Sequence, residues 1–328
     1  MKKVIQLETK IKCKSVGIDN IKLRDNKIHE YRELFNDQGY KIGEIESNIL
    51  SITIPMLYSN HNGNNLKLKN NATQIIADIK KALSKVGIDD FDLENCYSQS
   101  IEINCNFDTK KINPSSIVTY IAKVLEYYNS DNNNRTNRAC HTIKPDLNHP
   151  MSNNYSITDS VLHRESNFSF KVYNKTKQLK DTKNIYLDQN ILRIEIKFKG
   201  SYLKESSVEE GIQGILEKFE KLSQLYMKHT KSKLIDKLIK FQNELEKEII
   251  KELQEGKGLT KIYKSYKYYI LDSKTIENAL CSYLESIGVK EARKVAQNRV
   301  KELKKTHKEL KEFTGTQKVV DDIVKYFS

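Results

Sequence analysis

The sequence predicts an α+β fold in which a mainly antiparallel sheet with crossing helices is followed by a helical C-terminal region. Before Gly200, stretches that alternate between apolar and polar residues are mixed with stretches whose apolar residues recur every three to four positions. Alternation is typical of half-buried strands, and the longer repeat is typical of amphipathic helices. Beyond Gly200 only the helical repeat continues. We therefore expect two parts, residues 1–204 and residues 205–328.

The strands are predicted from alternation in the first part of the chain. They are Val4–Ile11, Ile45–Ile54, Ser98–Phe107, Ser160–Glu165, Phe168–Tyr173 and Ile191–Phe198. Pro55 should end the second of these strands, because proline has no N–H to give to a strand ladder. Ser166 and Asn167 are predicted to form a hairpin turn, which joins antiparallel strands.

Two helices are predicted among these strands. One begins after Asn71 and the other begins at Asn113-Pro114, because asparagine is a favoured N-cap and proline suits the first helical turn. The polar residues 129–155 are predicted to be a loop or a disordered insertion. The C-terminal region is predicted to contain the helices Val208–Met227, Lys231–Leu253, Ser273–Ile287 and Lys290–Phe313.

Charge and composition favour a cytoplasmic protein with a polyanionic partner. The chain has 56 basic and 43 acidic residues, a formal net charge of +13, which suits binding to DNA phosphates. The alternative is that lysine is simply abundant throughout the chain. Five scattered cysteines without a Cys-x-x-Cys pair indicate reduced thiols. No signal peptide or membrane-spanning apolar run is recognised, so we expect no membrane association.

Three places carry residues suited to catalysis. Tyr173 and Lys175 lie at the end of a predicted strand, and the strand Leu192–Lys197 places Glu195 on one face with two basic residues. His61 lies in a polar turn after another strand. Each has an ordinary explanation when it is taken alone. These are packing for a tyrosine on a strand, an ion pair for the glutamate and surface exposure for the histidine.

Taken in order, these blocks resemble the rolling-circle replication initiators of filamentous phages (the gene II/X type) and their relatives, the Rep_trans plasmid initiators. The resemblance covers about residues 45–205. Its blocks are His61-Asn62 after a strand and a proline, Glu102-Ile103-Asn104, the Tyr-x-Lys-x-x-x-Leu motif of Tyr173, Lys175 and Leu179, and Leu192–Lys197 followed by Tyr202-Leu203-Lys204.

The resemblance implies a relaxase-like palm and a DNA nicking-closing enzyme. Such an enzyme cuts one strand at an origin through a covalent 5′-phosphotyrosine and reseals it by the reverse reaction. Tyr173 would be the nucleophile. Lys175, two residues on and on the same strand face, would stabilise the phenolate or the phosphate. Origin DNA, both double- and single-stranded, would be the substrate. A host helicase and the replication machinery would be partners, and an oligomer is left open.

The resemblance also implies a divalent cation, Mg²⁺ or Mn²⁺, at the scissile phosphate. Glu195 would be a ligand, with His61, Glu102 and Asn104 as co-ligands, because these cations prefer oxygen and Mn²⁺ accepts imidazole. The sequence departs from the family at Asn104, where an aspartate is typical, and at Gln178, where a glutamate is common. The His-hydrophobe-His signature of the wider relaxase superfamily is absent. A neutral Asn104 implies weaker metal binding or a greater role for Glu102.

A second interpretation is a sequence-specific DNA-binding protein that derives from such an initiator and does not cut. The run Tyr263–Tyr269 interleaves tyrosines with lysines, which suits base stacking and phosphate contact but is also typical of an amphipathic helix or strand. A purely helical interaction protein, a third possibility, would leave the strands of the first part unexplained.

Overall fold

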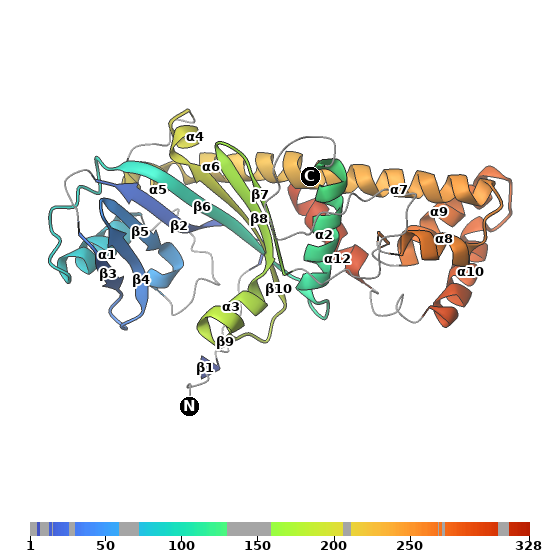
Figure 1. Cartoon of the computed structure of the whole chain (residues 1–328), viewed down its shortest axis with the longest axis horizontal. Coiled ribbons are helices and arrows are strands. Elements are labelled where there is room, and N and C mark those ends of the chain that lie inside the picture. The colour runs from blue at the N-terminus through green and yellow to red at the C-terminus, as the bar shows by residue number, and fades with distance from the viewer. Residues whose placement is uncertain are drawn as a thin grey trace. The chain divides into compact units, whose positions relative to one another are not determined.

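The structure is a computed structural model of the whole chain (Figure 1). It describes residues 5–6, 13–14, 16–25, 30–58, 72–129, 159–205, 211–267, 269–270, 273–307 and 315–328. The chain folds as two compact units. The first consists of residues 1–108 and 162–230, and the second of residues 109–161 and 231–328.

The first unit contains an eight-stranded antiparallel sheet, so the predicted α+β class is confirmed. In spatial order its strands are β3 (Arg32–Phe35), β4 (Lys41–Glu46), β5 (Ile49–Thr53), β2 (Val16–Arg24), β6 (Tyr97–Asp108), β10 (Ile191–Lys199), β8 (Phe168–Asn174) and β7 (Ser160–Arg164). A separate two-stranded parallel pair joins β1 (Ile5–Gln6) to β9 (Ile185–Tyr186).

Most of the predicted strands are present. The predicted hairpin turn joins β7 to β8, where the Glu165 N–H donates to the Phe168 carbonyl oxygen at 2.9 Å. The prediction of one strand at Ile45–Ile54 is wrong, because Ser47 has a positive φ of 57° and turns the chain between β4 and β5. Of the predicted strand Val4–Ile11, only β1 lies within the described residues. Strands β2 and β3 were not predicted.

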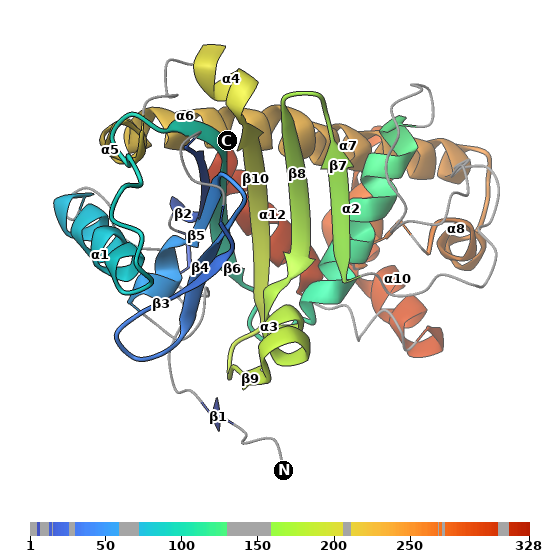
Figure 2. The ribbon, with the colours of Figure 1, turned by 60° about the vertical axis from the view of Figure 1, so that its left-hand side comes forward.

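The two faces of the central strands differ sharply in character. On β10 one face carries Ile194, Ile196 and Phe198, which are fully buried, and the helix α6 (Phe219–Thr230) covers this face. The Tyr226 hydroxyl of α6 donates to the Ile194 carbonyl oxygen at 3.0 Å, and Figure 2 shows α6 passing behind the sheet. The other face is polar and carries the candidate site.

The remaining helices of the first unit lie at the sheet edges and strand ends. They are the 3₁₀ helix Ile54–Leu57, α1 (Ala72–Ser84), α3 (Lys175–Lys183), α4 (Gly200–Glu205) and α5 (Ile212–Glu217). The predicted helix Val208–Met227 is interrupted at Lys218 and forms α5 and α6. The helix predicted after Asn71 is confirmed as α1.

The described part of the second unit is mainly helical, and it also includes Ser160 and Val161, the first two residues of β7. It contains α2 (Pro114–Asn129), a π-helical turn at Lys231–Ile235, α7 (Asp236–Gln254), α8 (Leu259–Tyr266), α9 (Ser273–Ser286), α10 (Ala292–Thr306) and α12 (Thr316–Phe327). Asn113 caps α2 as predicted, since its Oδ1 accepts the Ser115 N–H at 3.0 Å. Tyr120 and Tyr127 pack edge-on against Phe241 and join α2 to α7.

The compact units divide the chain differently from the predicted functional parts. Residues 109–161 cluster with the C-terminal helices, and α5 and α6 cluster with the sheet. The assignment of cutting to residues 1–204 and of DNA binding to residues 205–328 concerns function, and it stays a prediction. Among the described helices, none is both long and apolar enough to cross a lipid bilayer.

Candidate functional site

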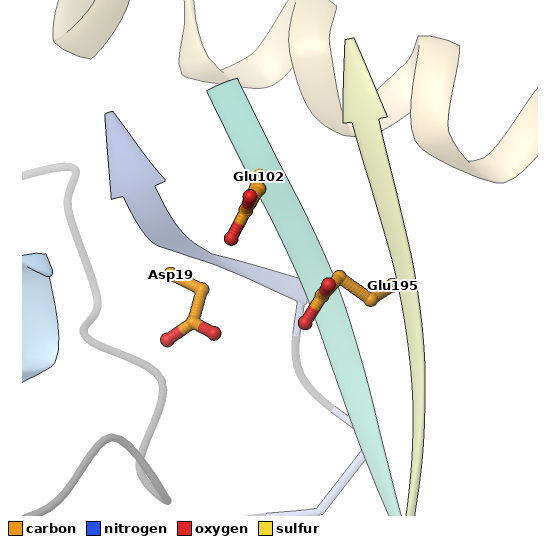
Figure 3. Close-up of side chains that lie close together, drawn as sticks. All are labelled: Asp19, Glu102 and Glu195. Atoms are coloured by element: carbon orange, nitrogen blue, oxygen red, sulfur yellow. The ribbon is translucent and has the colours of Figure 1, made fainter. Parts of the chain in front are cut away.

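Three carboxylates meet on the polar face of the central sheet. They belong to Asp19 on β2, Glu102 on β6 and Glu195 on β10 (Figure 3). One oxygen of each lies within 4.8 Å of the others. Asp19 is buried and the two glutamates are half-buried. Close packing of three acids costs free energy, because like charges repel strongly where water is largely excluded.

The pairing of the strands explains why these residues meet. Glu195 pairs with Asn104, and Lys197 pairs with Glu102, so alternate residues of β6 and β10 share one face. On β2 the register shifts between Ile18 and Asn20, which makes Asp19 the extra residue of a β-bulge. A bulge re-aims a side chain that plain alternation would direct elsewhere.

Tyr173 of β8 lies beside this carboxylate cluster. Its hydroxyl donates to the Glu195 Oε2 at 3.0 Å, and the Lys171 Nζ lies 4.4 Å from the centre of its ring. Only 4% of Tyr173 is exposed. The predicted nucleophile and the predicted metal ligand are therefore in direct contact.

Each of the three carboxylates also has a donor within the protein. Arg193 is fully buried, and its Nη1 lies 3.1 Å from the Asp19 Oδ2. The Lys197 Nζ lies 2.9 Å from the Glu102 Oε1, and Tyr173 donates to Glu195. These contacts offset the repulsion within the cluster.

The pKa values of Tyr173 and Glu195 are both raised above their ordinary values. Burial, together with the charges of Asp19 and Glu102, raises the pKa of Glu195 to about 7. Burial and the Glu195 charge raise the pKa of Tyr173 well above its ordinary value. Tyr173 is thus firmly protonated, and its neighbour titrates near neutrality, which suits a proton acceptor.

Lys175 lies next to Tyr173, although not in the predicted way. We expected it to share a strand face with Tyr173, but β8 ends at Asn174 and Lys175 is the first residue of α3. Its Nζ lies 5.8 Å from the centre of the tyrosine ring and donates to the Gln178 Oε1 at 2.8 Å. Burial and the charge of Arg193 hold the pKa of Lys175 well below its ordinary value.

The carboxylate cluster fits a hard divalent cation. Three carboxylate oxygens are the donor type that Mg²⁺ and Mn²⁺ prefer, at bonds of about 2.1 Å for Mg²⁺. Of the predicted ligands, Glu195 and Glu102 belong to the cluster. Asn104 is fully buried and pairs with Glu195 on the same face. His61 lies outside the described residues.

Sequence reasoning missed Asp19, which contributes the third carboxylate. The signal was present in the spacing of Ile18 and Ile21, both fully buried on β2. Plain alternation would place buried residues two or four positions apart, so an interval of three indicates an extra residue between them. Asp19 would then have been a candidate ligand.

The run Tyr263–Tyr269 does not form a stacking surface in the described part of the chain. Tyr263, Tyr266 and Tyr269 are buried, with exposures of 1–3%. Tyr266 donates to the Glu252 Oε1 at 3.2 Å. The run is therefore mainly the amphipathic helix α8, whose tyrosines face the core while its lysines face the solvent.

Comparison with known proteins leaves the site as the principal guide to function. No known protein family matches the chain. No curated protein matches its sequence either.

Proposed function

We propose that this chain is a metal-dependent DNA nicking-closing enzyme that cuts one strand through a covalent phosphotyrosine at Tyr173. The observation that carries the proposal is the 3.0 Å hydrogen bond from the Tyr173 hydroxyl to Glu195. Glu195 is also a member of a three-carboxylate cluster that fits a divalent cation. A nucleophile, a proton acceptor and a cation site therefore lie together on one sheet face. The net charge of +13 favours a polyanionic substrate.

The reaction is a transesterification in which atoms and charge balance. The Tyr173 oxygen attacks the phosphorus of a phosphodiester, and an O–P bond to the 5′ phosphate forms as the bond to the 3′ oxygen breaks. The phenol proton passes to Glu195, and the departing 3′ oxygen takes up a proton from solvent, to which Glu195 then releases the proton that it accepted. Because the phosphotyrosine conserves the bond energy, attack by the 3′-OH reverses these steps and reseals the strand.

The surrounding charges support each stage of this reaction. The Glu195 Oε2 accepts the hydrogen bond from Tyr173 and is therefore within reach of the proton that it takes up. A Mg²⁺ or Mn²⁺ ion held by Asp19, Glu102 and Glu195 would supply positive charge to the scissile phosphate. Lys175 has a lowered pKa, so it is better suited to exchange a proton than to serve as a fixed cation.

The burial of Tyr173 favours a second candidate function. With 4% exposure, the hydroxyl contacts a phosphate only after neighbouring side chains such as Lys171 move. A tyrosine that is permanently buried would be a structural residue. The chain would then be a sequence-specific DNA-binding protein that does not cut.

A covalent-capture experiment separates these two functions. The full chain is incubated with Mn²⁺ and a pool of radiolabelled single-stranded DNA, and the products are run on a denaturing gel. The nicking enzyme gives a protein band that carries label, and the labelled peptide contains Tyr173. Tyr173→Phe abolishes this band, whereas the control Tyr186→Phe, at a tyrosine that is 39% exposed, retains it. Labelling of the Tyr173→Phe protein at wild-type level would contradict the proposal.

A further inference from the structure

The helices α9 and α10 form a compact pair joined by a short turn (Figure 1). Gly288 in this turn has a φ of +76°, a conformation that glycine adopts without strain. The small residues Ala279 on α9 and Ala292 and Ala296 on α10 are buried. They let the two helices pack closely, and α9 also packs against α7. Two packed helices around a tight glycine turn are the framework of a helix-turn-helix motif.

One face of α10 is exposed and strongly basic. Lys294, Asn298, Lys301 and Lys305 follow the spacing i, i+4, i+7, i+11, which places them on one side of the helix. All four are exposed, and they lie opposite the buried stripe of Ala292, Ala296, Val300 and Leu303. One side of α10 is therefore buried against the protein, and the opposite side faces the solvent.

The charge of α10 as a whole is strongly positive. α10 carries the basic residues Arg293, Lys294, Arg299, Lys301, Lys304 and Lys305, with Glu302 as its one acid. Exposed ion pairs join Lys294 to Glu291 and Lys305 to Glu302, and such pairs contribute little. The side chains of Asn298 and Lys301 make no hydrogen bond or ion pair with other residues that the structure describes. The helix is thus electrostatically complementary to a polyanion.

We propose that α9 and α10 form a helix-turn-helix unit whose second helix, α10, lies in the major groove of duplex DNA. A helix of 15 residues is about 22 Å long and fits a groove about 12 Å wide. Its lysines contact phosphates along the groove. Asn298 presents an amide to the base edges, and amides pair best with adenine.

This inference deepens the proposed function by naming the surface that holds duplex DNA. It needs no chemistry at Tyr173, so the two proposals fail separately. A Tyr173→Phe protein still binds duplex through α10 even though it forms no covalent product. Conversely, a protein altered on α10 still joins to a single-stranded oligonucleotide in Mn²⁺, because that reaction takes place in the first unit.

The first test measures duplex affinity as a function of salt. Full-length protein is titrated into a fluorescent duplex of about 30 base pairs between about 50 and 200 mM salt. The double variant Lys294→Gln/Lys301→Gln binds about tenfold more weakly, and its log–log salt slope is smaller by about 2, since each lost phosphate contact removes nearly one unit. The matched control Lys247→Gln/Lys251→Gln removes two exposed lysines of α7 and retains the wild-type slope.

Circular dichroism and thermal melting establish that each variant is folded, and Lys301→Arg, which keeps the charge, retains the affinity. Equal slopes for the α10 variant and the wild type would overturn the inference. Equal losses on single-stranded and duplex DNA would also overturn it, since a groove-binding helix distinguishes the two.

The second test measures sequence preference. Binding-site selection from random duplexes yields a preferred sequence for the wild type. Asn298→Ala weakens binding to that sequence by about tenfold or more and relaxes the preference at one or two positions, with the salt slope unchanged. An unaltered preference in this variant would overturn the assignment of α10 to the major groove.

Discussion

Binding of Mn²⁺ should stabilise the folded chain more at pH 8 than at pH 6, because a proton and the cation compete for Glu195. The pKa of Glu195 is about 7 in the folded chain, raised from 4.5 by burial and by the charges of Asp19 and Glu102. A carboxyl with a raised pKa binds more protons in the folded state than in the unfolded state. The metal-free protein should therefore lose stability as the pH rises from 4.5 through 7.

The size of the effect follows from the fraction of Glu195 that is ionised. With a pKa of about 7, roughly a tenth of the groups are charged at pH 6 and roughly nine tenths at pH 8. The apparent affinity for Mn²⁺ then differs by about tenfold, or about 1.4 kcal/mol of stabilisation when the cation is in excess. For a domain of this size that corresponds to a difference of about 3–5 °C in melting temperature.

The assay is thermal unfolding of the full chain with and without Mn²⁺ at the two pH values. Glu195→Gln should remove most of the Mn²⁺-induced shift and its pH dependence. It should also make the metal-free protein more stable at pH 8, because residue 195 then carries no buried charge. Glu46→Gln, at an exposed carboxyl on β4, is the control and should behave as wild type. An equal Mn²⁺ shift at both pH values, or an unchanged shift in Glu195→Gln, would refute the reasoning.

Three further predictions concern stability, each measured by urea unfolding at pH 7. Arg193→Met should lower the free energy of unfolding by about 3–5 kcal/mol, because it leaves the Asp19 carboxylate buried without its cation; adding Asp19→Asn should recover part of this loss. Lys175→Met should leave stability unchanged or raised, since it removes an amine whose burial lowers its pKa; a large loss would show that the amine stabilises the fold. Gly43→Ala should cost about 1–3 kcal/mol, because the added Cβ would meet the Ser51 carbonyl oxygen on the neighbouring strand. Wild-type stability of this last variant would contradict so close an approach of β4 to β5.

The sequence predicted the central part of the fold well. Strands β6 and β10 have regular alternation, so which residues share a face could be derived from spacing alone. That reasoning correctly placed Glu195 on one face with Arg193 and Lys197. The contact between Tyr173 and Glu195 depends on β8 and β10 being neighbours in the sheet. This pairing joins segments that are distant in the sequence, so local alternation does not predict it.

The errors have local physical causes. Strand β2 was missed because its bulge breaks the alternation at Asp19, and with it the third carboxylate was missed. The tyrosines of the run Tyr263–Tyr269 looked available for stacking, but amphipathic spacing buries them. The change from mixed to helical patterning that was predicted near Gly200 is confirmed. This position is not a boundary between the two compact units, because the units are defined by contacts between segments that are distant in the sequence.

The discontinuous first unit has a consequence for how the chain is made. Strand β6 pairs with β10, yet residues 109–161 of the other unit are synthesised between them. Until β10 leaves the ribosome, β6 is an unprotected edge that carries buried apolar residues, and such edges invite pairing with other chains. The carboxylate cluster is also incomplete during this interval. Metal-binding capacity should therefore appear only late in synthesis, after the residues of β10 have emerged.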